Sequence, residues 1–253
     1  AFLGCLAYLP KMPRRRRSFD MAGFALLSLA IGALQLMLDR GGEVDWFAAV
    51  ETWIYLMVSI SGFWMFVVHI LTREHPFLDP KMFRDSNFRI GLVFIFVVGI
   101  ILLASLALLP PMLSRILGYP VITTGLVMAP RGVGTMISML VVGRLVRKVD
   151  PRMLVLAGLT LTALSLWEMT GFTPQMDNWP IIRSGVVQGL GLGLVFVPLS
   201  TIAFATLEPR FRADATSLFS LVRNIGSSIG ISVVTAAMTR NVQINHAELG
   251  AFI

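Results

Sequence analysis

The amino-acid sequence predicts an all-α, polytopic membrane protein. Of its 253 residues, 56% are hydrophobic and only 14% are charged, whereas soluble domains carry about 25% charged and about 45–50% apolar residues. The apolar residues gather in seven runs, each near the length of about 20 residues that a helix needs to cross a bilayer. The runs lack the alternation of a membrane strand, and a helix satisfies its own backbone hydrogen bonds in hydrocarbon. Each run is therefore predicted as a transmembrane helix.

The predicted spans are joined by connections too short to hold a soluble domain. In chain order they cover residues 19–38, 47–71, 90–109, 121–142, 153–171, 181–206 and 215–239. Ahead of them, residues 1–10 form an apolar run that is too short to cross a bilayer. Because the first residue is Ala1 rather than methionine, we interpret this run as a helix remnant and expect the sequence to be part of a longer chain.

The basic residues are distributed unevenly between alternate connections. Fifteen of the lysines and arginines fall on one side of the predicted membrane and four on the other. Cytoplasmic loops carry such an excess, so the Arg-rich connections are predicted to be cytoplasmic and the sequence to end outside. The net charge of +7 is spread between apolar runs rather than gathered in a patch, which argues against a nucleic-acid partner.

Charged side chains within the predicted spans are few. A charge at the bilayer centre costs at least about 2.5–3.5 kcal/mol on insertion scales, so each is a functional candidate. The one acid inside a run is Glu168, near the outer end, so this stretch alone is not expected to couple transport to protons. Arg131, beside Pro130, is interpreted either as a helix-bridging cation or as a cavity cation that pairs with an acid elsewhere in the protein. Arg223 lies close enough to the cytoplasmic end to reach the interface, and it is interpreted either as such an interfacial cation or as a functional one.

Three uncharged polar residues in the spans are further candidates for contact with a substrate. Gln35 and Gln188 are costly in lipid and are expected to face the bundle interior, where each would either hydrogen-bond a neighbouring helix or contact a substrate. Asn224 lies beside Arg223. Together with Arg131, these three residues are the predicted substrate-cavity candidates.

Glycines recur at four-residue spacing on two of the predicted spans. They are Gly185, Gly189 and Gly193 in one span and Gly226 and Gly230 in another. Such faces let helix backbones approach closely, so a packing role is predicted for them. No strand is predicted before Gly189, as a dinucleotide site would require, and the three histidines and one cysteine form no metal-binding pattern. No cofactor, metal or catalytic residue is therefore expected.

The connection GRLVRKVDPR, residues 143–152, concentrates four cations between two apolar runs. A basic cytoplasmic loop would account for the charge alone. The glycine entry and the Asp-Pro-Arg exit resemble the cytoplasmic signature loop of the major facilitator superfamily. That resemblance implies a gating role for Gly143, Arg144, Asp150 and Arg152. The pair at 147–148 is Arg-Lys, where the family usually has an acid followed by arginine, so a salt bridge of the loop is lost or moved to Asp150.

Nearly the whole chain resembles the EmrB/QacA-type drug:proton antiporters, a fourteen-helix branch of that superfamily. The resemblance rests on residues 19–47, 83–91, 129–152, 188–199 and 217–232. It implies a C-terminal fragment made of three parts. Residues 1–17 would be the end of a truncated helix and a basic cytoplasmic loop, 18–82 the linker pair of helices, and 83–253 an incomplete C-terminal bundle of five spans.

The function implied by this resemblance is proton-driven export of hydrophobic or amphipathic drugs across a bacterial inner membrane, by alternating access around a midplane site. The implied partners are small hydrophobic substrates, protons and the lipid bilayer, with a periplasmic adaptor and an outer-membrane channel in bacteria that have two membranes. A same-fold transporter of another cargo, such as a siderophore, amino acid or lipid, is the main alternative. A polytopic membrane enzyme or assembly factor is the alternative of another class.

Overall fold

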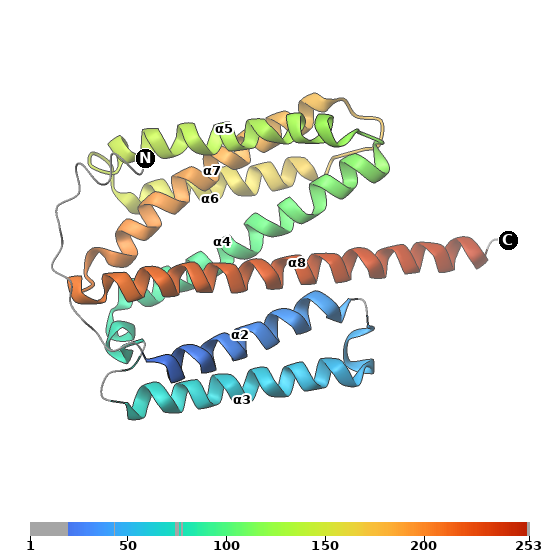
Figure 1. Cartoon of the computed structure of the whole chain (residues 1–253). Coiled ribbons are helices and arrows are strands. Elements are labelled where there is room, and N and C mark those ends of the chain that lie inside the picture. Colours follow the sequence, from blue (N-terminus) through green and yellow to red (C-terminus); the bar gives the residue numbers. More distant parts are fainter. Residues whose placement is uncertain (1–19, 43, 74–75, 77, 252–253) are drawn as a thin grey trace.

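The computed structural model describes residues 20–42, 44–73, 76 and 78–251 (Figure 1). The predicted helix remnant and basic loop at 1–17 lie outside these residues. Within the described part, the regular secondary structure consists of helices without strands. Seven of these helices are long and apolar enough to cross a membrane. The predicted fold class, an all-α protein with seven spans, is therefore confirmed.

The seven long helices overlap the seven predicted runs in order. They are α2 (Met21–Gly41), α3 (Val50–Thr72), α4 (Ser86–Pro111), α5 (Val121–Leu145), α6 (Pro151–Met169), α7 (Asn178–Ala205) and α8 (Arg212–Ala251). Four single-turn elements lie between them: η1 (Trp46–Ala48), η2 (Pro80–Arg84), η3 (Met112–Ile116) and η4 (Pro209–Phe211).

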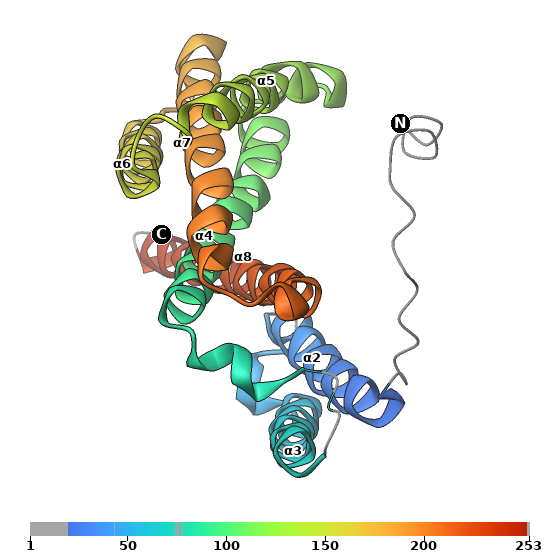
Figure 2. The same cartoon turned by 90° about the vertical axis from the view of Figure 1, so that its left-hand side faces the viewer.

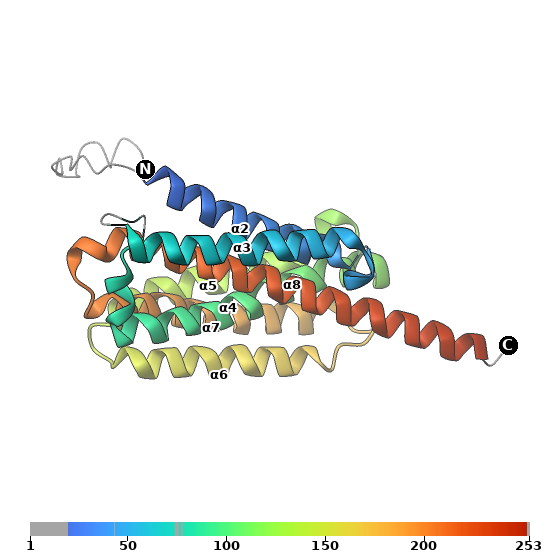
Figure 3. The same ribbon diagram turned by 90° about the horizontal axis from the view of Figure 1, so that it is seen from below.

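The long helices run side by side in three groups (Figures 1 and 2). Helices α2 and α3 form an antiparallel hairpin, α4 packs along α8, and α7 lies between α5 and α6. Contacts of α7 with α4 and of α2 with α8 join the three groups. The hairpin α2–α3 and helix α6 lie on opposite sides of the molecule, and the C-terminal part of α8 extends beyond the other helices (Figure 3).

Several helices begin directly after an aspartate that caps them. The carboxylates of Asp20, Asp85 and Asp150 accept hydrogen bonds from the backbone N–H groups of the first turns of α2, α4 and α6. A side-chain oxygen at this position satisfies one of the donors that a helix start leaves without a partner. The Asp-Pro pair at 150–151 starts α6, because proline fits the first helical position.

The carboxylate of Asp85 also ties the start of α4 to the end of α7. It accepts a hydrogen bond of 2.6 Å from the Thr206 hydroxyl, and Asn87 donates to the same hydroxyl at 3.2 Å. Burial raises the pKa of Asp85, but the hydrogen bonds from Thr206 and the backbone outweigh it, so the pKa lies below the usual 3.8. The carboxylate is thus held in its charged form.

The end of α4 differs from the sequence expectation. The predicted span ends at residue 109, but α4 runs through the two prolines at 110–111 and continues into a π-helical turn, η3. Prolines have no N–H to donate to the preceding turn. The helix instead widens into a π-helical turn, in which the N–H of Leu117 donates a hydrogen bond of 3.2 Å to the carbonyl of Met112. This extends the span beyond its predicted end at Leu109.

An apolar cluster lies where α2, α4 and α8 begin and α3 and α7 end. Its buried members are Leu27, Phe66, Leu78, Met82, Phe88, Leu207, Phe211, Ala215 and Leu218. Because these residues come from four long helices, α2, α3, α4 and α8, and from the segments between the helices, the cluster fixes the hairpin α2–α3 to the remaining helices at this end of the molecule.

A hydrogen bond and an ion pair connect neighbouring helices near their ends. Asp20 and His69 lie 2.9 Å apart at one end of the hairpin α2–α3, and Arg40 and Glu51 lie 3.1 Å apart at the other. Each end of the hairpin α2–α3 thus has a side-chain contact that joins its two helices.

Glu168, the acid that the sequence places inside a span, also has an interhelical partner. Its carboxylate lies 2.9 Å from the guanidinium of Arg183 on α7. An opposite charge at this distance compensates an acid near the end of a span. A structural role in joining α6 to α7 therefore accounts for Glu168.

Candidate functional site: a cavity lined by two arginines

The two arginines that lie inside apolar runs line the same cavity. This cavity has a volume of about 470 Å³ and lies between α4, α5, α7 and α8. Its walls are formed by Leu106, Met128, Arg131, Gly132, Thr135, Leu192, Phe196 and Arg223. Two of these residues are cations, and none of the described lining residues is acidic. The described wall of the cavity therefore holds two cations and Thr135 among apolar residues.

Arg131 is held deep within the bundle on α5. The residue is only 7% exposed, and it follows the start of α5 at Val121 by ten residues, which is about 15 Å along a helix. The backbone carbonyl of Arg131 packs against Gly189 of α7 and accepts a hydrogen bond from the Thr135 hydroxyl at 3.0 Å. These contacts fix the point from which its side chain extends.

Arg223 reaches the cavity from α8. Its guanidinium lies over the ring of Phe196 on α7, 5.9 Å from the ring centre, a geometry in which the ring attracts the cation. The helix begins eleven residues earlier, at Arg212, so Arg223 lies deeper than the sequence suggested. Its side chain points to Phe196 and the cavity rather than to the end of the span that the sequence predicts to be cytoplasmic.

Glycines on α7 allow α5 to approach closely. A Cβ atom at Gly189 would lie 2.2 Å from the carbonyl oxygen of Arg131, and one at Gly193 would lie 2.5 Å from the Cβ of Ser138. Both distances are far below van der Waals contact. A Cβ atom at Gly185 would meet the Arg131 side chain at 3.6 Å, an ordinary contact. The three glycines of this face are therefore not equivalent.

Glycines on α8 face α4 in the same way. A Cβ atom at Gly226 would lie 2.3 Å from the carbonyl oxygen of Phe96, and one at Gly230 would lie 2.5 Å from that of Ile100. The backbones of α4 and α8 can thus pack against each other next to Arg223.

Comparison with known proteins identifies the family. The sequence model of the Major Facilitator Superfamily matches residues 1–231. The chain belongs to this superfamily. It is also 35% identical over 235 residues to the multidrug export protein EmrB of Escherichia coli (strain K12), an alignment that covers 92% of this chain and 46% of the relative.

Two further relatives are similar over nearly the same region. The probable multidrug resistance protein EmrY of Escherichia coli (strain K12) is 32% identical, over 92% of this chain and 46% of its own length. The fatty acid resistance protein FarB of Neisseria gonorrhoeae is 32% identical, over 94% of this chain and 47% of its own length. The chain spans about half the length of these relatives. The predicted resemblance to EmrB-type members of the Major Facilitator Superfamily is confirmed.

Four residues were predicted as substrate-cavity candidates. Of these, only Arg131 is among the described residues that line the cavity between α4, α5, α7 and α8. Gln188 is fully buried and donates a hydrogen bond of 3.0 Å from its amide nitrogen to the Ser105 hydroxyl of α4. The amide oxygen of Gln188 has no hydrogen-bond partner among the described residues. Asn224 is exposed beside Arg223 and is absent from the described wall of the cavity.

Gln35 lies at a different place, between α2 and α8. It accepts a hydrogen bond from the Ser228 hydroxyl and donates to both carboxylate oxygens of Asp39 at 3.0 Å. It also lines a separate cavity of about 590 Å³ between these two helices. In the structure, Gln35 therefore hydrogen-bonds a neighbouring helix, which is one of the two roles predicted for it.

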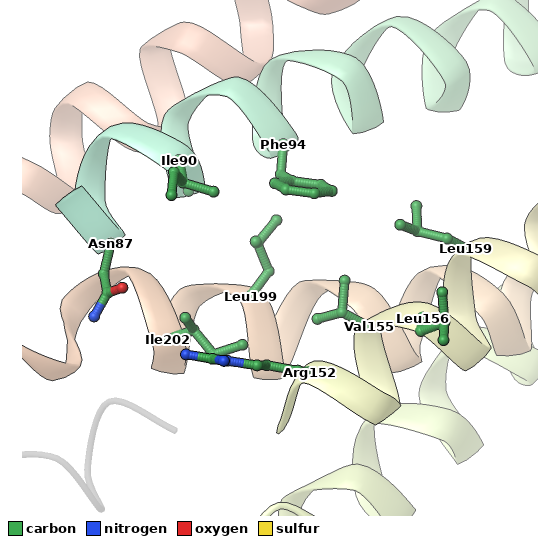
Figure 4. A pocket seen from close by; sticks show the side chains of 10 residues that line it. Asn87, Ile90, Phe94, Arg152, Val155, Leu156, Leu159, Leu199 and Ile202 are labelled. Carbon is green, nitrogen blue, oxygen red and sulfur yellow. The ribbon is translucent and has the colours of Figure 1, made fainter. Parts of the chain in front are cut away.

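The predicted gating loop borders a third cavity, of about 430 Å³, between α4, α6 and α7. Arg152 and Asn87 lie toward one end of this cavity, and the side chains along the rest of it are apolar (Figure 4). Asp150 caps α6 through the N–H of Arg152 at 2.9 Å, while Gly143 and Arg144 are exposed. Among the described residues, Asp150 forms no ion pair with the cations of the loop. The gating role of this superfamily loop stays a prediction.

Proposed function

We propose that the complete protein exports hydrophobic or amphipathic compounds, drugs included, across the membrane by alternating access. The observation that carries the proposal is the cavity of about 470 Å³ between α4, α5, α7 and α8, whose volume lies within the range of about 300–1,000 Å³ for small-molecule pockets. Its wall is apolar apart from the two arginines and Thr135. The names of the relatives, two for multidrug transport and one for fatty acid resistance, support the same class of cargo.

The energy source we propose is the inward flow of protons. None of the described residues that line the cavity is acidic, so this part of the protein supplies a wall of the substrate site. The coupling carboxylates would belong to the other part of the transporter. We extend the proposal to a periplasmic adaptor and an outer-membrane channel, which would receive the exported compound.

We also propose that α2 and α3 are the linker pair between two halves of the transporter, and that the five helices from α4 onward belong to the second half. Two hydrogen bonds support a firm attachment of the pair. Ser228 of α8 donates to Gln35 of α2, and the Ser232 hydroxyl of α8 donates to the Leu38 carbonyl of α2 at 2.9 Å. The linker pair would then move together with the second half.

The proposed substrate site is tested by filling the cavity. Gly132 lines it, and a Cβ atom there would meet nothing within 4 Å, so Gly132→Trp should occupy the cavity without displacing backbone. We expect the full-length variant to export a fluorescent amphipathic dye at least about tenfold more slowly than the wild type, because one indole fills much of a pocket of this size. Efflux is measured from cells that lack other exporters, at matched membrane abundance.

The control for this experiment is Gly125→Trp on the same helix. A Cβ atom at Gly125 also meets nothing within 4 Å, but Gly125 does not line the cavity. Efflux close to that of the wild type is expected. Equal efflux by the two variants would contradict the assignment of the cavity to the transport path.

We propose that the Arg-rich connections face the cytoplasm, as the uneven distribution of lysines and arginines predicts. On a background without Cys5, a cysteine at Val149, between α5 and α6, should not react with a membrane-impermeant thiol reagent added outside intact cells. A cysteine at Thr173, in the connection between α6 and α7, should react. The opposite labelling pattern would reverse the proposed orientation.

The gating role of the loop is proposed on the resemblance alone, with Gly143, Arg144, Asp150 and Arg152 as its residues. Asparagine can replace aspartate as a helix cap, so Asp150→Asn would retain the bond to the Arg152 N–H and remove only the charge. Slower efflux by this full-length variant at matched abundance supports gating, whereas unchanged efflux leaves a basic connection with a capping residue.

A further inference from the structure

The cavity between α4, α6 and α7 changes from polar to apolar along its length (Figure 4). Asn87 and Arg152, at its polar end, are each the second residue of their helix, α4 and α6. Phe94 and Leu159 line the wall seven residues further along the same helices, which is about 10 Å. The cavity therefore has one polar end and an apolar remainder about two helical turns long.

The polar end carries a positive charge. Arg152 is a cation, and none of the described lining residues is acidic. Among the described residues, no carboxylate forms an ion pair with the Arg152 side chain. The carboxylate of Asp150 bonds the backbone N–H of Arg152, and that of Asp85 bonds a hydroxyl at the end of α7. Arg147 and Lys148 lie in the connection that leads into α6, so the charge at this end suits an anion.

The cavity opens toward the outside of the helix bundle, where lipid surrounds a membrane protein. Helix α6 lies at one side of the molecule, opposite the hairpin α2–α3 (Figure 3). Although they line the wall, the side chains of Ile90, Phe94 and Leu156 are exposed. The cavity shares no described lining residue with the one that holds the two arginines. A lipid chain can therefore enter it from the side.

We propose that this cavity binds an anionic phospholipid of the cytoplasmic leaflet. The phosphate accepts hydrogen bonds from the Arg152 guanidinium and from the Asn87 amide, which has a second N–H besides the one that bonds the end of α7. One acyl chain lies along Phe94, Leu156 and Leu159. A guanidinium matches phosphate oxygens with paired donors, and basic pockets between helices on the cytoplasmic side suit the head groups of such lipids.

The position of the polar end favours a phospholipid over a free phosphate. Both α4 and α6 begin on the side that the distribution of lysines and arginines predicts to be cytoplasmic. Arg152 therefore lies near the membrane interface, which is the depth of the lipid head groups. A free phosphate would gain nothing from the apolar wall. This inference goes beyond the proposed function, because it concerns a lipid that surrounds the transporter and not the exported compound.

The test compares three probes on the purified full-length transporter in detergent. They are phosphatidylglycerol, phosphatidylcholine with the same acyl chains, and inorganic phosphate, and native mass spectrometry measures their binding. We expect the wild type to bind phosphatidylglycerol about tenfold more tightly than phosphatidylcholine, because only the former has a net negative charge. Arg152→Gln should lose this preference, whereas Arg152→Lys should retain most of it. Inorganic phosphate at equal concentration should not displace phosphatidylglycerol.

The control is Arg147→Gln, which removes the same charge from an exposed residue outside the described wall. It should change the lipid preference much less than Arg152→Gln does. Equal effects of the two substitutions would indicate a general attraction to the basic connection and would overturn the site. Equal affinity of the wild type for the two lipids would also overturn it, because another segment of the complete transporter then covers the cavity. Displacement by inorganic phosphate would overturn the role of the apolar wall. These measurements require no transport, so their outcome is separate from that of the proposed function.

Discussion

Replacing Gly189 by alanine is expected to prevent the full-length transporter from reaching the membrane in a folded, active form. A Cβ atom at this position would lie 2.2 Å from the carbonyl oxygen of Arg131 and 3.0 Å from the backbone nitrogen of Thr135. Both neighbours are backbone atoms, so no side chain can rotate away. Helix α5 would have to move away from α7, and overpacking of a close-packed site typically costs about 1–3 kcal/mol or more. Leucine at this position should have a still larger effect.

The matched control is Gly185→Ala, one turn earlier on the same face of α7. A Cβ atom there would meet the Arg131 side chain at 3.6 Å, an ordinary contact. This variant should reach wild-type abundance and transport. The two proteins are compared by size-exclusion chromatography in detergent and by dye efflux. If both variants behave alike, the close approach of α5 to α7 at Gly189 does not exist in the protein.

The sequence alone does not predict this difference between Gly185 and Gly189. Four-residue spacing puts Gly185, Gly189 and Gly193 on one face of a helix, and nothing in the sequence separates them. The difference between these glycines depends on where α5 crosses α7, and that crossing point is known only from the packed helices. The same limit applies to Gly99, which lies in no four-residue glycine pattern. A Cβ atom at Gly99 would lie 2.3 Å from the carbonyl oxygen of Arg223.

The spans themselves were predictable because hydrocarbon imposes one requirement on every one of them. Each must be apolar and close to 20 residues long, and each must satisfy its backbone internally. The seven helices therefore overlap the apolar runs in order. The end of α4 is one of the differences, because the prolines at 110–111 are accommodated by a π-helical turn that local preferences do not reveal.

The wall of the candidate site was only partly predictable. Arg131 was selected because a cation in mid-span is costly. Arg223 was not selected, since distance from the end of an apolar run placed it near the interface. Its spacing from Gly226 and Gly230, three and seven residues, offered a usable signal, because these intervals place it on the face of α8 that packs against α4. Gln188 satisfied the expectation of an interior residue, but which helix it bonds could be learned only from the fold.

The second large effect is expected at Phe88, the fully buried aromatic residue in the first turn of α4. Its ring centre lies 6.2 Å from those of both Phe83 and Phe204, within the apolar cluster that joins the hairpin α2–α3 to the other helices. Phe88→Ala would leave a cavity in this cluster, at a cost of about 3–5 kcal/mol. The segment η2, which contributes the buried Met82 to the same cluster, should then detach more often.

Trypsin reports this detachment, because η2 contains Lys81 and Arg84. When opening and closing are fast relative to cleavage, the cleavage rate follows the open population, so Phe88→Ala in the full-length protein should be cut in η2 about a hundredfold faster than the wild type. Phe47→Ala is the control, because that ring is 51% exposed in η1 and its loss leaves no enclosed cavity. Equal cleavage of the two variants would show that the cluster does not hold the hairpin. Selective cleavage of Phe88→Ala would show that the attachment of the hairpin α2–α3 depends on this apolar cluster. The hydrogen bonds from Ser228 and Ser232 of α8 to α2 would then be insufficient to hold the hairpin in place without the cluster.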